Sequence, residues 1–170
     1  MKKLQMMSNN KTRLFSLTVI ISMVLTDQLI KYLIDLYLKP VSVKKLIPGF
    51  LQLHYFENDG AMMGFMSGKT EVMTIASVIC MIGILAVILS GKFKFGVEFV
   101  CLVFMAAGGF GNIIDRVFRG YVIDYIEVLF IDFYIFNFAD CLVTCSAFIL
   151  IFYEFYSVYK EYKTKKEKNG

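Results

Sequence analysis

The sequence predicts an all-α membrane protein: four transmembrane helices with a small extracytoplasmic β layer and a short interfacial segment. Three observations support this prediction. Of the 170 residues, 58% are hydrophobic, and the mean hydropathy of +0.64 is well above that of soluble globular domains. Four windows are long and apolar enough to cross a bilayer. Two of the connecting segments are rich in aromatic and β-branched residues, which favour strands.

The four predicted spans follow from length and hydropathy. A transmembrane helix needs about 20 mostly apolar residues, and the windows that qualify are 14–34, 71–90, 97–115 and 135–156. An even number of spans places both termini on one side of the membrane. Lys and Arg outside the spans are more numerous on that side than in the loops 35–70 and 116–134, so the positive-inside rule places the termini in the cytoplasm and these loops outside. We expect residues 1–170 to form one domain.

The outer loops are predicted to carry the β layer. Residues 46–58 partly alternate apolar and polar side chains, and 121–135 are aromatic and β-branched, so each segment predicts a short strand. The stretch "NDGAMMGF" at 58–65 predicts a tight turn followed by the interfacial segment. The β layer is therefore expected on the outer membrane surface.

Charge and cysteine usage narrow the function classes. The net charge of +4 arises from basic residues gathered at the two ends of the chain, a pattern typical of cytoplasmic anchors on anionic lipid and not of a nucleic-acid site. The four cysteines lie in apolar stretches without a CxxC or His/Cys spacing. We therefore expect membrane lipid as a partner, no nucleic acid, no metal and no cofactor.

Polar residues within the spans concentrate at one depth, near the predicted outer surface. Buried charges in a bilayer are costly and mark either ion pairs or a functional site. Asp27 and Lys31 are four residues apart and can pair on one helix face, and an Asn at a helix end is often a cap. For the charged residues, mutual neutralisation and substrate positioning both remain open. The residues at this depth are Asp27, Lys31, Asn112, Asp115, Arg116, Asn137 and Asp140.

Asp124 and Asp140 are harder to explain as scaffolding. Asp124 lies in the outer loop shortly before Asp140, so a short excursion of the chain can bring the two carboxylates together. Two carboxylates in a partly desolvated site tend to share one proton near neutral pH. The ionised member can activate a water while the protonated member donates to a peptide carbonyl. This pair predicts an aspartic peptidase. The helix dipole suggests Asp140 as the more acidic member.

At these residues the sequence resembles the lipoprotein signal peptidases of bacteria, signal peptidase II. The similarity covers most of the chain, and the last two motifs, in this order and at this spacing, are specific. The motifs are DxxxK (Asp27, Lys31), an Asn-x-Gly turn (Asn58, Gly60), GNxxDRxxxGxVxD (Gly111, Asn112, Asp115, Arg116, Gly120, Val122, Asp124) and FNxAD (Phe136, Asn137, Ala139, Asp140).

The resemblance implies a four-helix enzyme of the bacterial cell membrane, with its site near the outer face and an outer β cradle. Its substrates would be prolipoproteins whose cysteine carries diacylglycerol, cleaved just before that cysteine with Asp124 and Asp140 as the catalytic pair. Globomycin-type inhibitors are expected to bind, and we expect a monomer. By the same resemblance the site-supporting or substrate-binding residues would be Asp27, Lys31, Asn58, Gly60, Asn112, Asp115, Arg116 and Asn137.

Two other functions fit the pattern of polar residues less well. A small proton- or ion-coupled transporter would distribute polar groups along a path through the bilayer, whereas here they stop at one level. An intramembrane protease of the presenilin kind needs Asp after the glycine of its GxGD motif, and Asn112 follows Gly111 here. Within the resemblance, Met62, Met63 and Tyr125 depart from the residues common in the family, and the effect on substrate contacts is open.

Overall fold

Four helices and a three-stranded sheet make up the described part of the chain. The computed structural model describes residues 9–60, 70–90 and 95–169. Each helix is long and apolar enough to cross a membrane, which confirms the four predicted spans. The elements are α1 (Asn9–Tyr37), β1 (Val43–Ile47), β2 (Leu51–Asn58), α2 (Thr70–Ser90), α3 (Val97–Arg119), β3 (Val122–Val128) and α4 (Phe138–Asn169).

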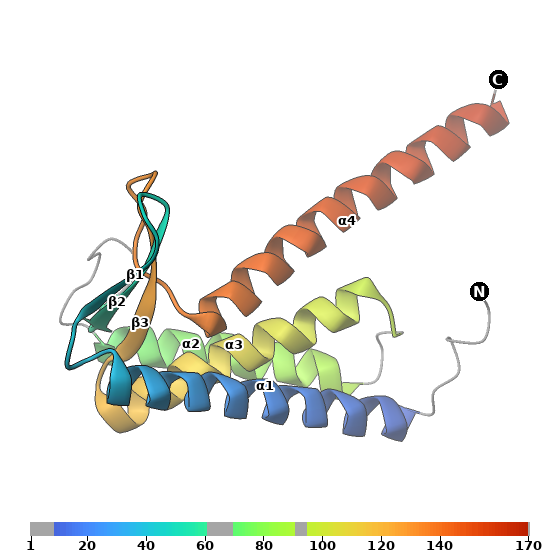
Figure 1. Cartoon of the computed structure of the whole chain (residues 1–170). Helices are drawn as coiled ribbons and strands as arrows, with labels where there is room; N and C mark the ends of the chain where they lie inside the picture. Colours follow the sequence, from blue (N-terminus) through green and yellow to red (C-terminus); the bar gives the residue numbers. More distant parts are fainter. Residues whose placement is uncertain (1–8, 61–69, 91–94, 170) are drawn as a thin grey trace.

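Helix α3 is the centre of the helical part and contacts α1, α2, α4 and β3 (Figure 1). Small residues make this position possible, because Ala106 and Ala107 are buried in the main apolar cluster. A methyl group added at Gly108 would collide with the backbone oxygen of Ala139 in α4. The glycine at 108 therefore allows α3 and α4 to approach each other closely. Large side chains such as Ile79 and Phe148 point outward on the other helices, as lipid-facing residues do.

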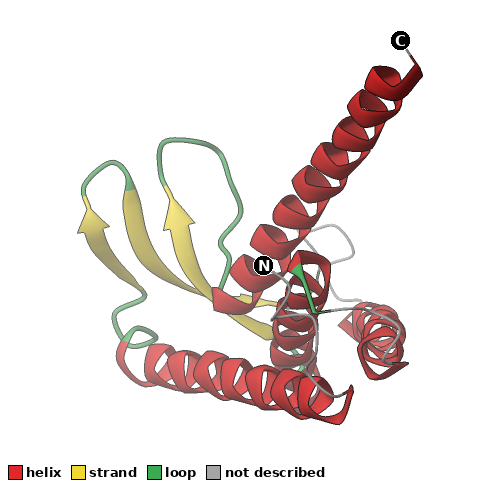
Figure 2. Ribbon diagram, turned by 90° about the vertical axis from the view of Figure 1, so that its right-hand side faces the viewer, coloured by secondary structure: helices red, strands yellow, loops and turns green. Residues whose placement is uncertain are grey.

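The sheet is antiparallel in the order β1-β2-β3 and lies at one end of α1 and α3 (Figure 2). The strand predicted over 46–58 is confirmed for Leu51–Asn58, which is β2, but its predicted start was wrong. The chain turns at Gly49, whose φ of 70° favours glycine, and forms a hairpin from β1 and β2. The second predicted strand, 121–135, ends at Val128, because Val128 pairs with Leu51 at the first residue of β2 and the partner strand extends no further.

A left-handed residue links α3 to β3. Gly120 has φ 82° and its N–H donates to the Arg116 carbonyl at 3.2 Å, which ends the helix in the manner of an αL cap. The chain enters β3 two residues later. A second cluster beneath the sheet, built on Leu38, Ile123 and Tyr125, fixes β3 against α1. The predicted interfacial segment falls mostly within 61–69, outside the described residues.

Candidate active site

Asp124 comes from the middle of β3, where it pairs across the sheet with Phe56 of β2. Its side chain is 1% exposed. Asn137 Nδ2 donates to Oδ1 at 2.6 Å, and Asn58 Nδ2 donates to Oδ2 at 2.8 Å. Burial, followed by the negative charge of Asp140, raises the pKa of Asp124 to about 7. This carboxyl group is therefore poised to change its protonation state near neutral pH.

Asp140 lies in the first turn of α4, where it forms a reciprocal cap with Asn137. The Asp140 N–H donates to Asn137 Oδ1 at 2.9 Å, and the Asn137 N–H donates to Asp140 Oδ2 at 3.1 Å. This is the arrangement of a capping box, which satisfies donors that a helix N-terminus would otherwise leave free. Asn112 Nδ2 donates to the other oxygen, Asp140 Oδ1, at 2.8 Å.

The two carboxylates line one cavity of about 490 Å³. Asn137 joins them directly, because its side-chain amide bonds to Asp124 while its backbone N–H bonds to Asp140. Within the described residues, every hydrogen bond to either carboxylate comes from an amide N–H, and neither carboxylate forms an ion pair with Lys or Arg. The cavity is also lined by Asn58, Gly60, Met73, Ala76, Ser77, Cys80, Met81, Gly109, Asn112, Arg116, Tyr134, Val143 and Thr144.

A buried ionic cluster lies directly behind this cavity. Lys31 Nζ is 2.8 Å from Asp27 Oδ2, 2.8 Å from Asp115 Oδ2 and 2.9 Å from Asn112 Oδ1, so each of its three hydrogens has an acceptor. The Lys31 side chain is 0% exposed. The ion pair predicted between Asp27 and Lys31 is confirmed. Because Lys31 donates to the Asn112 oxygen, the amide nitrogen of Asn112 must face Asp140.

The Asn-x-Gly turn fixes the second amide that faces Asp124. The Gly60 N–H donates to Asn58 Oδ1 at 3.1 Å. This bond holds the Asn58 oxygen toward its own turn and leaves the amide nitrogen directed at Asp124. Asn58, Asn112 and Asn137 therefore present nitrogen, not oxygen, to the two carboxylates.

Comparison with known proteins gives this arrangement its family. Residues 19–156 match the family model described as signal peptidase (SPase) II. The chain belongs to the signal peptidase II family. The lipoprotein signal peptidase of Enterococcus faecalis (strain ATCC 700802 / V583) is 36% identical over 161 residues, which cover 94% of this chain and 98% of that protein. The one from Lactobacillus johnsonii is 33% identical over 147 residues, covering 86% and 95%.

Solved structures agree with the family assignment. A bacterial membrane enzyme determined at 2.3 Å resolution by the in meso method superposes with a TM-score of 0.76 and 30% identity, covering 85% of this chain and 89% of that one. A second such structure, at 1.9 Å, gives a TM-score of 0.71 and 31% identity, covering 81% and 90%. As a signal peptidase II, the protein is a multi-pass bacterial membrane peptidase of lipoprotein processing.

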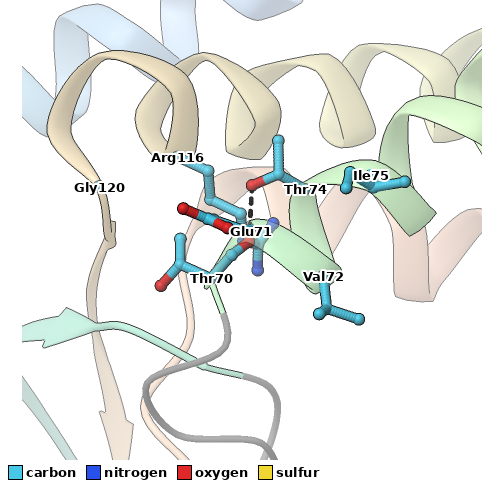
Figure 3. Close-up of a pocket in the computed structure, with 7 residues that line it drawn as sticks. All are labelled: Thr70, Glu71, Val72, Thr74, Ile75, Arg116 and Gly120. Atoms are coloured by element: carbon cyan, nitrogen blue, oxygen red, sulfur yellow. Dashed lines mark hydrogen bonds between the residues drawn. The ribbon is translucent and has the colours of Figure 1, made fainter.

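Arg116 lies between the cavity of this signal peptidase II and a second pocket. It lines both the cavity with the two aspartates and a neighbouring pocket of about 770 Å³. Figure 3 shows the second pocket, with Arg116 from α3 beside Thr70 and Glu71 from the start of α2, where Thr74 Oγ1 donates to the Thr70 carbonyl at 2.7 Å. No carboxylate of the described residues lies within ion-pair distance of Arg116, so its guanidinium retains donors for a substrate.

Sequence reasoning missed two residues that support the site. Gln28 Nε2 lies 3.1 Å from the Gly111 carbonyl, 3.2 Å from Asp115 Oδ1 and 3.3 Å from Asp27 Oδ2, and so ties the ionic cluster to α3. The sequence feature that could have identified Gln28 is a polar side chain next to Asp27 inside an apolar span. Tyr125 accepts a hydrogen bond from the Phe138 N–H at 3.2 Å and so holds the start of α4. Met62 and Met63 lie outside the described residues.

No group of three or more His, Cys, Asp or Glu within residues 9–60, 70–90 and 95–169 is placed to hold a metal ion.

Proposed function

We propose that this signal peptidase II is an aspartic endopeptidase that uses Asp124 and Asp140 to cleave diacylglyceryl-modified prolipoproteins just before the lipidated cysteine. The observation that carries the proposal is the Asn137 bridge, which bonds to both carboxylates at the wall of one cavity. The names of the relatives support prolipoproteins as the substrates.

The two carboxylates differ in a way that suits acid-base catalysis. A pKa of about 7 lets Asp124 hold the shared proton near neutral pH. Asp140 lies in the first turn of α4, where the helix dipole favours negative charge, and is therefore the member suited to remain ionised. Asp140 would remove a proton from water as the water attacks the scissile carbonyl, and Asp124 would donate its proton to the carbonyl oxygen. The proton taken by Asp140 would then pass to the leaving amine as the C–N bond breaks, while a hydroxyl of the tetrahedral intermediate returns a proton to Asp124 and becomes the carbonyl oxygen of the new carboxyl group.

The remaining predicted residues fall into two roles in this proposal. Asp27, Lys31 and Asp115 neutralise one another and hold Asn112, so they support the site without facing the cavity. Arg116, Asn58 and Asn112 line it, whereas Asn137 is buried behind the two carboxylates that it joins. We assign Arg116 to the substrate backbone or to negative charge that develops on it. The site lies near the outer membrane face and both termini are cytoplasmic, with globomycin-type inhibitors binding in the same cavity and the enzyme acting as a monomer.

No observation favours the transporter alternative. The charged residues that are buried in the described part of the chain are Asp27, Lys31, Asp115 and Asp124, and all four belong to the site or to the cluster behind it. A path for ions would need such groups at other depths of the four helices.

The test is Asp140→Asn in a cell with a single copy of the gene, with Asp132→Asn as the matched control because Asp132 is exposed in the loop after β3. We expect lipidated, uncleaved prolipoprotein to accumulate with Asp140→Asn and normal processing with Asp132→Asn. Normal maturation in the Asp140→Asn strain would refute the aspartic mechanism. In the purified parent enzyme, globomycin should block cleavage of a lipidated substrate.

A further inference from the structure

The far end of the sheet carries an apolar surface that the function above does not use. We define the sheet tip as residues 46–50, which are the end of β1 and the turn to β2, together with residues 129–133, the loop after β3. Its large apolar side chains are exposed: Leu46 47%, Ile47 50%, Phe50 48%, Leu129 38%, Phe130 58%, Ile131 50% and Phe133 40%. Exposed turns in water favour Gly, Asn, Asp, Ser and Pro, so this composition needs a cause.

The two loops of the sheet tip form one continuous surface. The Leu129 N–H donates to the Phe50 carbonyl at 2.9 Å, which fastens the second loop to the first. The rings of Phe50 and Phe130 stack with centroids 4.8 Å apart and an interplanar angle of 12°. Asp132 is the only charged residue in the two loops. The sheet tip is therefore a single aromatic and aliphatic patch held together by backbone and ring contacts.

The sheet places this patch to one side of the transmembrane helices α1, α2 and α3. The strands rise steeply from the ends of α1 and α3 and do not continue along them, and both loops of the sheet tip lie away from α1, α2 and α3 (Figure 1). Figure 2 shows the same separation from a second direction. Since α1, α2 and α3 cross the membrane, an arm that runs across their ends extends along the membrane surface and beyond these three helices, on the side toward which α4 leans (Figure 1).

We propose that the sheet tip inserts into the interfacial layer of the outer leaflet and anchors the sheet on the bilayer. The interfacial layer of the bilayer suits the side chains of the sheet tip, because aromatic side chains concentrate where headgroups meet acyl chains. Lys44 and Lys45 in β1 are exposed just before Leu46, where their ammonium groups can reach lipid phosphates while the apolar residues lie deeper. Anchoring at the tip restrains β3 from its far end, and β3 carries Asp124.

The chain offers a clean spectroscopic test because it contains no tryptophan. The full-length variant Phe130→Trp, reconstituted in phosphatidylcholine and phosphatidylglycerol vesicles, places one reporter in the sheet tip. Ile79→Trp is the membrane-embedded control, because Ile79 in α2 is 64% exposed. Glu167→Trp is the aqueous control, because it lies about 44 Å along α4 from Phe138 at 1.5 Å per residue, beyond the hydrocarbon core of about 30 Å.

We expect Phe130→Trp emission to be blue-shifted from that of Glu167→Trp and quenched by lipids brominated near the headgroup about twofold or more beyond that control. Ile79→Trp should instead be quenched best by lipids brominated near the chain ends. Emission and quenching of Phe130→Trp equal to those of Glu167→Trp would overturn the proposal. A blue shift without quenching by any brominated lipid would also overturn it, because it would place the sheet tip against protein. Neither readout depends on peptidase activity, so this test and that of the aspartic mechanism can fail separately.

Discussion

Replacing Lys31 by methionine tests whether the ionic cluster holds the site together. Lys31→Met keeps an unbranched chain of similar length and removes the cation that serves Asp27, Asp115 and Asn112. The two carboxylates are 1% and 0% exposed, so each would remain buried without its cation. Removing one partner of a buried ion pair costs about 3–5 kcal/mol. At about 2–4 °C per kcal/mol for a chain of this size, the melting temperature should fall by about 6–20 °C.

The assay is thermal unfolding of the purified enzyme in detergent, with a matched substitution on the surface. Lys39→Met also removes a lysine that contacts two carboxylates, Asp35 at 3.5 Å and Glu57 at 3.0 Å, but these groups are about half exposed. Exposed ion pairs contribute little, so Lys39→Met should retain nearly the parent melting temperature. Equal losses for the two variants would refute the argument that burial makes the Lys31 cluster decisive.

A rescue variant separates charge from packing. Combining Lys31→Met with Asp27→Asn and Asp115→Asn removes both orphaned charges, and a buried polar cluster replaced as a whole costs much less than one that is broken. We expect the triple variant to recover most of the lost melting temperature. Cleavage should recover less, because the Asn112 oxygen would keep only Asn137 Nδ2, at 3.1 Å, of the two donors that direct its amide nitrogen toward Asp140. Full recovery of cleavage would show that Lys31 does not position Asn112.

Three further predictions concern stability. The raised pKa of Asp124 means that the folded state binds the proton more tightly, so its contribution is greatest below about pH 4 and is lost as the pH rises through about 7; melting temperatures at about pH 5 and pH 8 should therefore differ less in Asp124→Asn than in the parent. Gly111→Ala would place a methyl group 2.6 Å from Asp27 Oδ2 and should cost about 1–3 kcal/mol in unfolding free energy. Tyr125→Phe leaves the Phe138 N–H without its acceptor and should cost about 1 kcal/mol by the same measurement.

Hydropathy predicted the transmembrane part well because the bilayer imposes a simple requirement on length and polarity. Where hydropathy placed the end of a helix incorrectly, the cause is local. Helix α4 continues to Asn169, past the predicted end at 156, because a helix that leaves the apolar layer can continue on polar residues. Lys165 and Glu161, 2.8 Å apart at i,i+4 spacing, support this part. A hydropathy window does not detect such a helix, since its residues resemble a polar tail.

The sheet was harder to predict because strand limits depend on the partner strand. Residues 129–135 have strand-forming composition, yet β2 begins at Leu51 and leaves them without a neighbour beyond Val128. The turn at Gly49 could have been inferred from Pro48 and Gly49 together. Propensity alone gave the right kind of element in both outer loops and the wrong lengths.

For the site, the sequence predicted which residues meet but not how their amides are oriented. The spacing of Asp124 and Asp140 brought the two carboxylates to one cavity, as the structure shows. That Asn112 presents nitrogen to Asp140 depends on Lys31, which lies far away in the sequence. The role of Gln28 likewise depends on α1 packing against α3. Such contacts arise from tertiary packing, which the spacing of residues along the sequence does not predict.

The Asn137 and Asp140 pair explains how a carboxylate can be kept at the top of a membrane helix. The cost of a charge in the bilayer falls when protein donors replace its water. Two N–H groups bond to Asp140, one of them from the cap that α4 requires in any case, and the helix dipole favours its charge. Because the same cap directs Asn137 Nδ2 to Asp124, forming the first turn of α4 also positions the two carboxylates. Folding of the helix and preorganisation of the site are thus one event, and a change that frays this turn should impair catalysis before it unfolds the protein.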